Sequence, residues 1–458
     1  MRPHALLLLI AGCARTPPCE VVRDAAARGG QARNVMIVIL DDVGVDQLAS
    51  WELTDDVAPT PTVDCLCEVG TRFTQAWSSP MCSPTRAELQ TGRYNRRTGI
   101  GDILAQDRPS YELPIEEETL AEVAGRGGMR SALVGKWHLV SDGREDAQTH
   151  PNRSGYDHFA GALANLSAVP KGMKGPLGYD RWVKVEDGKE RISHTYATTD
   201  QIDEAIDFVR HTDEPWLLVV SFAAPHVPLH APPGRLLDEK VSDDADDVTL
   251  YRAMLSAADH ELGRLFSAMG PEVLGDTTVA LLGDNGTPRD AIVAPFLGAG
   301  AKGTMTEGGV RVPLVFTGPT VAQGASTDAL AHVVDLLPTL AALVDVEPAA
   351  PILDGASLLD VLTDPSAPGP HDTIASFRFP DVGSLDPDPT ELNRAMRNDR
   401  YKIETHGKDV SLFAVSPDAL DEGPDLLADG VSAEEQAELD ALWEDLSALE
   451  LTFGGTSR

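Results

Sequence analysis

Four oxygen-bearing side chains stand at two places in the sequence where a cation could be held. Asp41 and Asp42 follow one apolar run. Asp284 and Asn285 follow another, and neither place has a zinc-type pattern of His or Cys around it. Carboxylate and amide oxygens are ligands that hard cations such as Ca²⁺ and Mg²⁺ prefer. An Asp-Asp pair alone often caps a helix and Asp-Asn-Gly often forms a turn, so only the pairing of the two places predicts a metal site.

Four basic side chains offer the complementary chemistry. Lys136 and Lys302 could supply positive charge to an anionic substrate. His138 and His226 are expected to titrate near neutrality and to move protons. A lone lysine or histidine is more often a surface or packed residue, so these four gain meaning only if the fold brings them into one cleft.

The segment Cys82–Arg93, with the sequence CSPTRAELQTGR, predicts a short helix. Ser83 is expected to cap this helix, with Pro84 at its first position and Gly92 at its end. Cys82 would then lie beside a helix N-terminus, where the backbone dipole lowers the pKa of a free thiol. On the residues alone, a nucleophilic cysteine is one chemistry that this segment allows.

Short apolar runs precede most of these polar residues. Each run suits a strand that is buried on both faces, and they are Val35–Leu40, Ser131–Val134, Leu217–Phe222, Thr278–Leu282 and Leu314–Phe316. Between the runs, apolar residues recur with helical spacing at Ile202, Ala205, Ile206 and Val209, and again at Met254, Leu255, Ala258, Leu262 and Leu265. Alternating strands and helices predict an α/β fold with a large, mostly parallel sheet between layers of helices.

Such a fold would bring the polar clusters together. In open α/β sheets the ligand site lies just outside the carboxyl ends of the strands. The clusters that follow the runs are Asp41-Asp42, Gly135-Lys136-Trp137-His138, Ala223-Ala224-Pro225-His226 and Gly283-Asp284-Asn285-Gly286. Four such clusters at one edge of a sheet are hard to explain as solvated loops, so the sequence predicts a reaction site there.

Composition limits the class of protein and its partners. With 458 residues, 42% of them hydrophobic, the chain can bury a large core and is not disordered. Lys and Arg number 37 against 72 Asp and Glu, and the net charge of −35 disfavours nucleic acid and anionic membranes as partners of the general surface. An anionic substrate therefore has to meet local positive charge, and the same surface favours small or sparsely charged substrates over long polyanions.

The N-terminus resembles a bacterial lipoprotein signal. An apolar stretch from Ala5 runs into Ile10-Ala11-Gly12-Cys13, so residues 1–12 are predicted as a signal peptide, with lipid attached to Cys13. Ala14 follows the cysteine, which indicates the outer membrane of a Gram-negative bacterium. Residues 13–33 are predicted as a tether without periodic structure, with the folded core beginning near Asn34. A frayed cytosolic N-terminus is the alternative.

The motifs together resemble the type I sulfatases of the alkaline-phosphatase superfamily. Cys82-x-Pro84-x-Arg86, followed by Leu-x-Thr-Gly-Arg, resembles their signature, in which the cysteine becomes Cα-formylglycine. The remaining family motifs are also present, in the family's order along the chain. They are Asp41-Asp42 before the signature and, after it, Gly135-Lys136-Trp137-His138, Pro225-His226, Gly283-Asp284-Asn285-Gly286 and Lys302-Gly303-Thr304. Two further segments resemble the family, namely Asp335-Leu336-Leu337-Pro338-Thr339 and Arg400-Tyr401-Lys402-Ile403. Only the first ~30 residues lie outside the resemblance.

The resemblance implies a role for each site residue. Asp41, Asp42, Asp284 and Asn285, with modified Cys82, would hold Ca²⁺ or Mg²⁺. Arg86 and Lys136 would orient the hydrated formylglycine, and Lys302 would bind the sulfate. His226, with Lys302, would protonate the leaving oxygen, and His138 would accept a proton when sulfate is expelled. Maturation would require a formylglycine-generating enzyme.

Two departures from the family pattern concern side chains near the signature. Thr85 stands where the family usually has Ser or Ala. Cys65 and Cys67 have no family role, and two residues apart on a helix they cannot face each other. Packed core cysteines are the prediction for this pair, with at most one disulfide among Cys19, Cys65 and Cys67.

The resemblance also implies two domains. A catalytic domain is expected over residues 34–370 and a small α+β domain with an antiparallel sheet over 371–458. No Lys or Arg occurs from Asp409 to Ser457, and Ser432–Leu449 predicts a capped helix with Leu439, Leu442, Trp443 and Leu446 on one face. Its acidic residues predict a solvated face, with a partner-binding tail as the alternative.

Sulfate ester hydrolysis is the function that this resemblance implies. The substrate would be a small aryl or carbohydrate sulfate, released as an alcohol and inorganic sulfate. A phosphatase or phosphonate monoester hydrolase of the same superfamily stays an alternative, because it could use the same fold and a related nucleophile. A catalytically inactive, sulfatase-like binding protein is less favoured, because every position of the constellation is filled.

Overall fold

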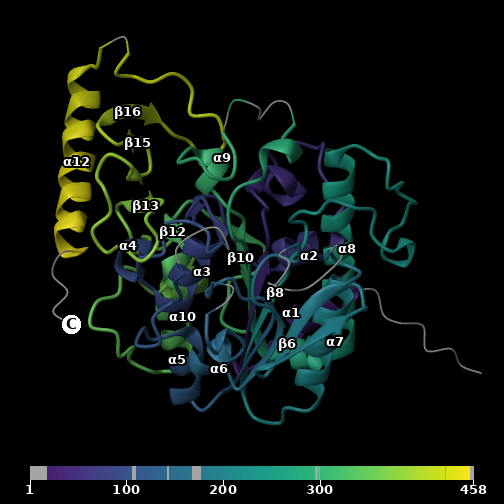
Figure 1. Cartoon of the computed structure of the whole chain (residues 1–458). Coiled ribbons are helices and arrows are strands. Elements are labelled where there is room, and N and C mark those ends of the chain that lie inside the picture. The colour runs from purple at the N-terminus through teal and green to yellow at the C-terminus, as the bar shows by residue number, and fades with distance from the viewer. Residues whose placement is uncertain are drawn as a thin grey trace, which may run out of the picture.

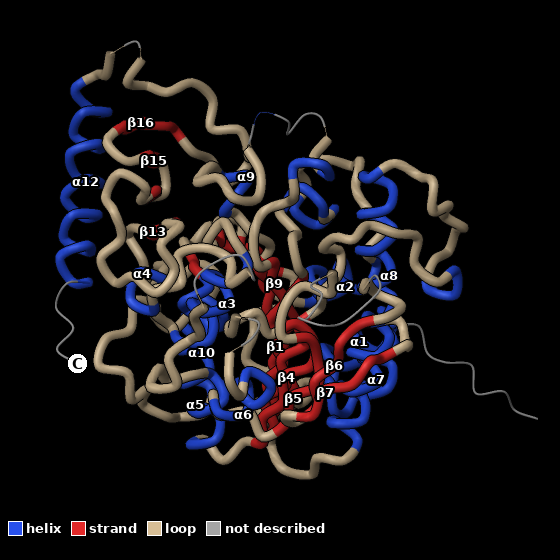
Figure 2. The backbone as a smooth tube through the Cα atoms, viewed as in Figure 1, coloured by secondary structure: helices blue, strands red, loops and turns tan. Residues whose placement is uncertain are grey.

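A ten-stranded sheet forms the centre of the molecule (Figure 2). The computed structural model describes residues 18–105, 110–141, 144–167, 177–293, 298, 300–428 and 430–453. The strands of the sheet are β1 (Asn34–Leu40), β2 (Thr71–Phe73), β4 (Arg130–Lys136), β5 (His158–Ala162), β6 (Trp182–Glu186), β7 (Lys189–Ser193), β8 (Trp216–Ser221), β9 (Thr277–Gly283), β10 (Leu314–Thr317) and β11 (Ala325–Thr327). Their order across the sheet is β11-β2-β10-β9-β1-β8-β4-β5-β6-β7.

The middle of this sheet is parallel. β9, β1, β8, β4 and β5 run in one direction, whereas β10 is antiparallel to β9 and β6 is antiparallel to β5. The predicted runs Val35–Leu40, Ser131–Val134 and Thr278–Leu282 lie within β1, β4 and β9. The predicted α/β fold with a mostly parallel sheet is confirmed.

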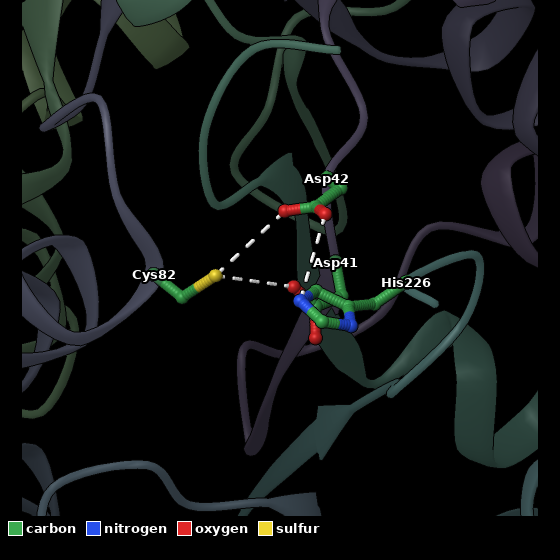
Figure 3. Close-up of side chains that lie close together, drawn as sticks. All are labelled: Asp41, Asp42, Cys82 and His226. Carbon is green, nitrogen blue, oxygen red and sulfur yellow. Dashed lines mark hydrogen bonds and ion pairs between the residues drawn. The ribbon is translucent and has the colours of Figure 1, made fainter. Parts of the chain in front are cut away.

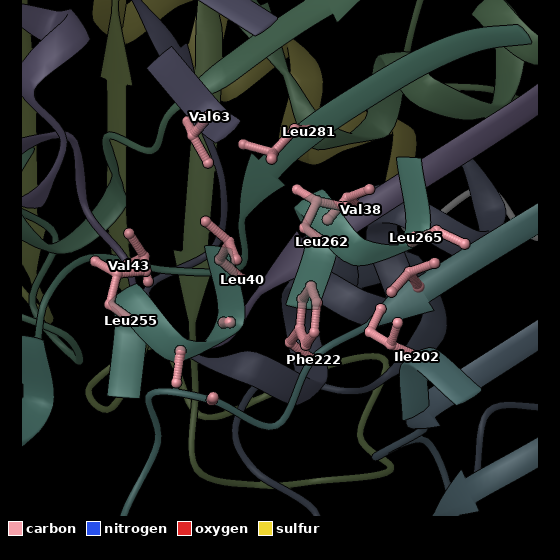
Figure 4. Close-up of a cluster of buried hydrophobic side chains, with 14 of the residues drawn as sticks. Val38, Leu40, Val43, Val63, Ile202, Phe222, Leu255, Leu262, Leu265 and Leu281 are labelled. Atoms are coloured by element: carbon pink, nitrogen blue, oxygen red, sulfur yellow. The ribbon is translucent and has the colours of Figure 1, made fainter. Parts of the chain in front are cut away.

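Helices cover both faces of the sheet (Figure 1). One face carries α1 (Pro18–Arg28), α2 (Pro61–Val69), α7 (Ala197–Arg210) and α8 (Asp247–Gly275), and the other carries α3 (Cys82–Thr91), α5 (Leu120–Arg126) and α10 (Leu336–Leu343). Val38 and Leu40 pack with Leu255 and Leu262 of α8 (Figure 4). Ile37 packs into the opposite core. β1 is therefore apolar at successive positions because both of its faces are buried.

Helix α1 occupies part of the predicted tether. Val21, Val22 and Ala25 of α1 are buried in the core shared with α2 and α8. Cys19 of this helix forms a disulfide with Cys65 of α2. The prediction of a tether is thus wrong for residues 18–28. Three apolar side chains on one face pack this helix against the core, and the disulfide attaches it to α2. The predicted signal peptide and Cys13 lie outside the described residues.

The same disulfide corrects the prediction for the cysteines. Cys65 is a disulfide partner instead of a packed thiol, whereas Cys67 is a free thiol that packs against the core. Burial raises the pKa of the Cys67 thiol to about 12. Cys67 is therefore a packed cysteine, as predicted.

A second sheet follows at the C-terminal end of the chain. It is antiparallel and consists of β13 (Ile374–Arg378), β14 (Asn393–Arg397), β15 (Tyr401–His406) and β16 (Asp409–Ala414). Helix α12 (Ala433–Phe453) lies along it at the left edge of Figure 1. The small antiparallel unit is confirmed, while a boundary at residue 370 stays a prediction.

Helix α12 departs from its predicted face at one residue. Ser432 and Glu435 form the capping box that the sequence predicts. Leu442 and Leu446 are buried, but Trp443 is 40% exposed and lies under the guanidinium of Arg394. Trp443 is adjacent to Leu442 in sequence, so its side chain leaves the helix about 100° away from that of Leu442.

The remaining elements are short connections between these layers. They are α4 (Asn95–Thr98), α6 (His150–Arg153), α9 (Glu307–Val310), α11 (Leu359–Thr363) and the two-stranded pair β3 (Ala76–Trp77) and β12 (Ala331–His332). Among the helices of the described residues, none combines the length and apolarity needed to cross a membrane.

Candidate active site

The parallel strands deliver the predicted polar residues to one edge of the sheet. Asp41 and Asp42 follow the last residue of β1, Asp284 follows β9, and Lys136 ends β4. Because β4, β8, β1 and β9 are neighbours with the same direction, their carboxyl ends meet. Figure 3 shows the side chains of Asp41, Asp42, Cys82 and His226 pointing toward one another there.

Acidic groups and the cysteine lie at the centre of this site. The Cys82 Sγ atom is 3.4 Å from Asp41 Oδ1 and 3.7 Å from Asp42 Oδ1. One ligand atom from each of Asp41, Asp42, Cys82 and His226 lies within 4.8 Å of the others. The backbone N–H of Asp42 donates to Asp284 Oδ1 at 2.9 Å, which brings the third carboxylate into the group.

The donor set fits a hard cation. Asn285 donates from Nδ2 to Asp42 Oδ1 at 2.9 Å, which leaves its Oδ1 atom buried without a hydrogen-bond partner. A buried amide oxygen without a partner is costly unless an ion or water binds it. With three buried carboxylates next to this oxygen, Asp41, Asp42, Asp284 and Asn285 form a site suited to Ca²⁺ or Mg²⁺.

Basic side chains surround the acidic group. Lys136 Nζ lies 2.5 Å from Asp41 Oδ2. Lys302 Nζ contacts Asp42 Oδ1 and lies 3.3 Å from Cys82 Sγ. Arg86 donates from Nε and a terminal nitrogen to Asp284 Oδ2 at 3.2 and 2.9 Å. Each lysine or arginine of the predicted set therefore pairs with a carboxylate of the predicted metal site.

These neighbours shift the pKa values of the carboxyl groups in different directions. Burial opposes ionisation of Asp42, but the charges of Lys302 and His226 outweigh it and lower the pKa. Burial and the charge of Asp284 raise the pKa of Asp41 to about 7. Three carboxylates this close repel one another, which is the condition that a divalent cation relieves.

The helix that begins at Cys82 differs from the prediction at its start. Met81 is the N-cap residue, and Ser83 Oγ instead accepts from the backbone N–H of Leu104 at 3.1 Å. Gly92 ends the helix at φ 66°, as expected for a residue that must adopt the left-handed conformation. The predicted cap at Ser83 is wrong because a tertiary contact takes its hydroxyl.

The ionisation of Cys82 is also opposite to the prediction. Its side chain is fully buried, and burial together with the charge of Asp284 raises the thiol pKa. The helix dipole and the charges of Lys136 and Lys302 do not compensate for this. An unmodified Cys82 is therefore a poor source of thiolate.

Both predicted histidines lie at the site. His226 Nε2 is 3.8 Å from Asp42 Oδ2, and Nδ1–H donates to Val227 O at 2.9 Å. Burial lowers the pKa of His226 to about 4 and that of His138 well below its usual value. His138 Nδ1 is buried without a hydrogen-bond partner. The expectation that both titrate near neutrality is wrong for the protein without substrate, because neither imidazole has enough solvent or negative charge around it.

Three supporting hydroxyl groups were not predicted. Ser221 Oγ accepts from Arg86 at 2.6 Å and donates to Lys136 O at 2.7 Å. Tyr251 donates to Asp42 O at 2.6 Å, and Tyr179 donates to His226 O at 2.7 Å. Ser221 ends an apolar strand and Tyr251 lies on an apolar helix face, so neither carries a local signal of function.

Glycine permits the close packing behind Lys136. Gly135 has φ 109°, and a Cβ atom there would lie 1.9 Å from the backbone oxygen of Ser221. Only glycine tolerates both the conformation and the contact. This position therefore fixes where β4 presents Lys136 and His138.

Known proteins resemble this chain in sequence and in fold. A family model described as Sulfatase matches residues 33–346. Arylsulfatase G of Homo sapiens is 30% identical over 392 residues, which cover 74% of this chain and 70% of that protein. A crystal structure of Ps i-CgsB in complex with k-i-k-neocarrahexaose has a TM-score of 0.76 at 25% identity, covering 92% of this chain and 93% of that one.

A protein with a different activity has a similar fold. The crystal structure of phosphonate monoester hydrolase of Agrobacterium radiobacter has a TM-score of 0.66 at 20% identity, over 92% of this chain and 96% of that one. This likeness is one of fold alone. The match to the family model covers most of the chain, including every predicted site residue, and so the protein belongs to the sulfatase family, the arylsulfatase-like sulfuric ester hydrolases of the alkaline-phosphatase superfamily.

Proposed function

We propose that this sulfatase hydrolyses an aryl or carbohydrate sulfate ester through a formylglycine formed from Cys82. The observation that carries the proposal is the position of Cys82, whose Sγ atom lies between the Asp41 and Asp42 carboxylates and the Lys302 ammonium. A group attached at this carbon can meet a sulfuryl group that is held by the surrounding charges.

The environment of Cys82 favours an uncharged nucleophile. A thiolate at this position would be buried next to carboxylates, which is why the thiol pKa is raised. The hydrate of an aldehyde carries two neutral hydroxyl groups and avoids this cost. One hydroxyl would lose its proton to a neighbouring carboxylate and form the new S–O bond, while the bond between sulfur and the alcohol oxygen breaks.

The donor set supports a divalent cation as the cofactor. Asp41, Asp42, Asp284, Asn285 and the modified Cys82 would hold Ca²⁺ or Mg²⁺, which when bound polarises the sulfuryl oxygens. Arg86 and Lys136 would fix Asp284 and Asp41 around it.

The remaining residues would bind the sulfate and move protons. Lys302 Nζ, next to Cys82, would bind a sulfate oxygen. His226 would protonate the leaving alcohol oxygen from Nε2, the nitrogen that faces the site, because Nδ1–H is already donated to Val227 O. The approach of an anion raises the pKa of a buried imidazole and makes this protonation easier. His138 would accept the proton of the second hydroxyl, so that sulfate leaves and the aldehyde is restored.

Export of the protein is part of the proposal. The Cys19–Cys65 disulfide supports an oxidising compartment, since cytosolic thiols are kept reduced. Lipid attachment at Cys13 in the outer membrane, and a formylglycine-generating enzyme as the partner in maturation, remain parts of the same proposal.

Mass spectrometry tests the central step. Protein made together with a formylglycine-generating enzyme should contain an aldehyde in the peptide that includes Cys82, and Cys82→Ala should lack sulfate release. Full activity in a preparation with only unmodified cysteine would contradict the proposal. Comparing turnover of an aryl sulfate, an aryl phosphate and a phosphonate monoester separates it from the alternative phosphonate or phosphate hydrolase, and no turnover of any ester would indicate a binding protein.

A further inference from the structure

The loop that carries Lys302 is held by the small C-terminal sheet. Gly303 O accepts a hydrogen bond from Arg378 at the end of β13. Met305 O accepts from Lys402 Nζ of β15 at 2.5 Å, and the N–H of Glu307 donates to Glu422 at 2.9 Å. Three backbone positions after Lys302, at residues 303, 305 and 307, are therefore fixed by residues from beyond the catalytic sheet.

Lys402 is the centre of these contacts. Its side chain is completely buried, and its ammonium contacts Met305 O and the carboxylate of Glu422. It also lies 3.9 Å from Glu307, the first residue of α9, which Figure 1 shows beside the small sheet. A buried ammonium is costly unless it is paired, so these contacts hold both Lys402 and the loop in one arrangement.

The same cluster reaches the segment that precedes Cys82. Lys402 Nζ lies 5.1 Å from the ring centroid of Trp77, and Trp77 Nε1 donates to Glu307 at 3.1 Å. Further along that segment, Pro80 O accepts from the N–H of Gly303 at 2.8 Å. The two segments that converge on the reaction centre thus share one buried support.

We propose that Lys402 is a positioning residue for Lys302, acting through the backbone of residues 303–307. It lies too deep to touch a substrate, and its bond to Met305 O fixes the direction in which the loop presents the Lys302 ammonium. This gives a role to Lys402 within the Arg400-Tyr401-Lys402-Ile403 segment. The inference rests on the proposed function, in which Lys302 binds the sulfate.

A double-mutant cycle tests the inference. Lys402→Met should lower kcat/KM for nitrophenyl sulfate about 10²-fold, the loss expected for a misplacement of about 1 Å. In a Lys302→Ala background the same substitution should cost less than about threefold, since residues acting through one group are not additive. Inorganic sulfate should also inhibit Lys402→Met more weakly than the unaltered protein. A purely structural role would cost the same factor in both backgrounds, and that result overturns the inference.

Two further variants make the test decisive. Arg400→Met is the matched control, because Arg400 adjoins the start of β15 but its half-exposed guanidinium pairs with Glu434 and Glu438 and lies over the ring of Tyr401. It should change kcat/KM by less than about twofold. If Lys402→Met does not fold, the same cycle with the partly exposed Arg378→Met applies. Unaltered activity in Lys302→Ala alone would remove the proposed role of Lys302 itself, whereas additive losses remove only the role of Lys402.

Discussion

At the scale of the residue, the surroundings of each side chain decide what it can do. The sequence predicts that Asp41, Asp42, Lys136 and Asp284 meet, because each ends or follows a strand of the parallel part of the sheet. It does not predict their protonation, since the opposite shifts of Asp41 and Asp42 depend on contacts with Lys302 and Asp284 that lie far away in the chain. The thiol pKa of Cys82 is likewise raised where the sequence predicted a lowered value, because burial depends on the whole fold.

Removing one charge from the proposed metal site should abolish most activity. Asp284→Asn keeps the shape of the side chain but weakens cation binding, and we expect activity to fall about 10²-fold or more. Asp46→Asn is the control, because Asp46 is buried close by but bonds Thr287 and Gln47 instead of the cluster. Elemental analysis of both proteins gives the metal content. Full activity after exhaustive chelation would contradict a metal site.

The two histidines should respond differently to the leaving group. A general acid contributes ~10²–10⁴-fold, and mostly when the departing alcohol is a strong base. His226→Ala should therefore slow a sugar sulfate far more than nitrophenyl sulfate. His138→Ala should slow both equally, because the alcohol has left before its step. If His138→Ala instead shows the stronger effect on the sugar sulfate, the roles assigned to His138 and His226 are reversed.

At the scale of the element, the long apolar strands could be predicted and the short elements could not. β1 and β9 are buried on both faces, so their residues from Val35 and from Val279 onward form clear apolar runs. β10 gives the same signal, but its antiparallel direction is set by pairing with β9 and β2. Helix α1 has only one narrow apolar face and its disulfide partner is distant in sequence, so the sequence does not predict its docking.

Loss of the disulfide should destabilise the protein without affecting catalysis. The bond joins cysteines 46 residues apart, and removing both with Cys19→Ala and Cys65→Ala should lower the unfolding free energy by about 2–4 kcal/mol. Denaturant unfolding measures this, and kcat/KM should stay unchanged because α1 lies away from the carboxyl ends of the strands. Cys67→Ala, which alters a neighbouring free thiol, should have a smaller effect. An unchanged midpoint in the double variant would show that packing alone holds α1.

At the scale of the whole molecule, the small sheet is joined to the large one by buried polar contacts. Besides Lys402, His371 bonds Asp335 from Nε2 at 2.7 Å, and Asp335 also accepts from the N–H groups of His332 and Ala356. The His371–Asp335 and Lys402–Met305 contacts join residues 36 and 97 positions apart in the sequence. Sequence periodicity identifies each unit but not how they are joined.

The His371–Asp335 pair should make stability depend on pH. Burial opposes protonation, but the hydrogen bond and charge of Asp335 raise the pKa of His371 above 6.5. The stabilisation is thus complete below about pH 6.5 and is lost as the pH rises through the higher folded value. His371→Gln should lower the unfolding free energy by about 1–2 kcal/mol at pH 6 and by less at pH 9. Equal losses at both values, measured in urea, would exclude a charged imidazole.

The complete burial of Cys82 has a consequence for how active protein is made. A modifying enzyme needs to enclose the cysteine and its neighbours, and it cannot do so once α3 is packed beneath the sheet edge. If Cys82 is converted as proposed, conversion would have to precede the packing of α3. The active fraction is then fixed during synthesis, and adding the modifying enzyme to folded, unconverted protein should not increase it.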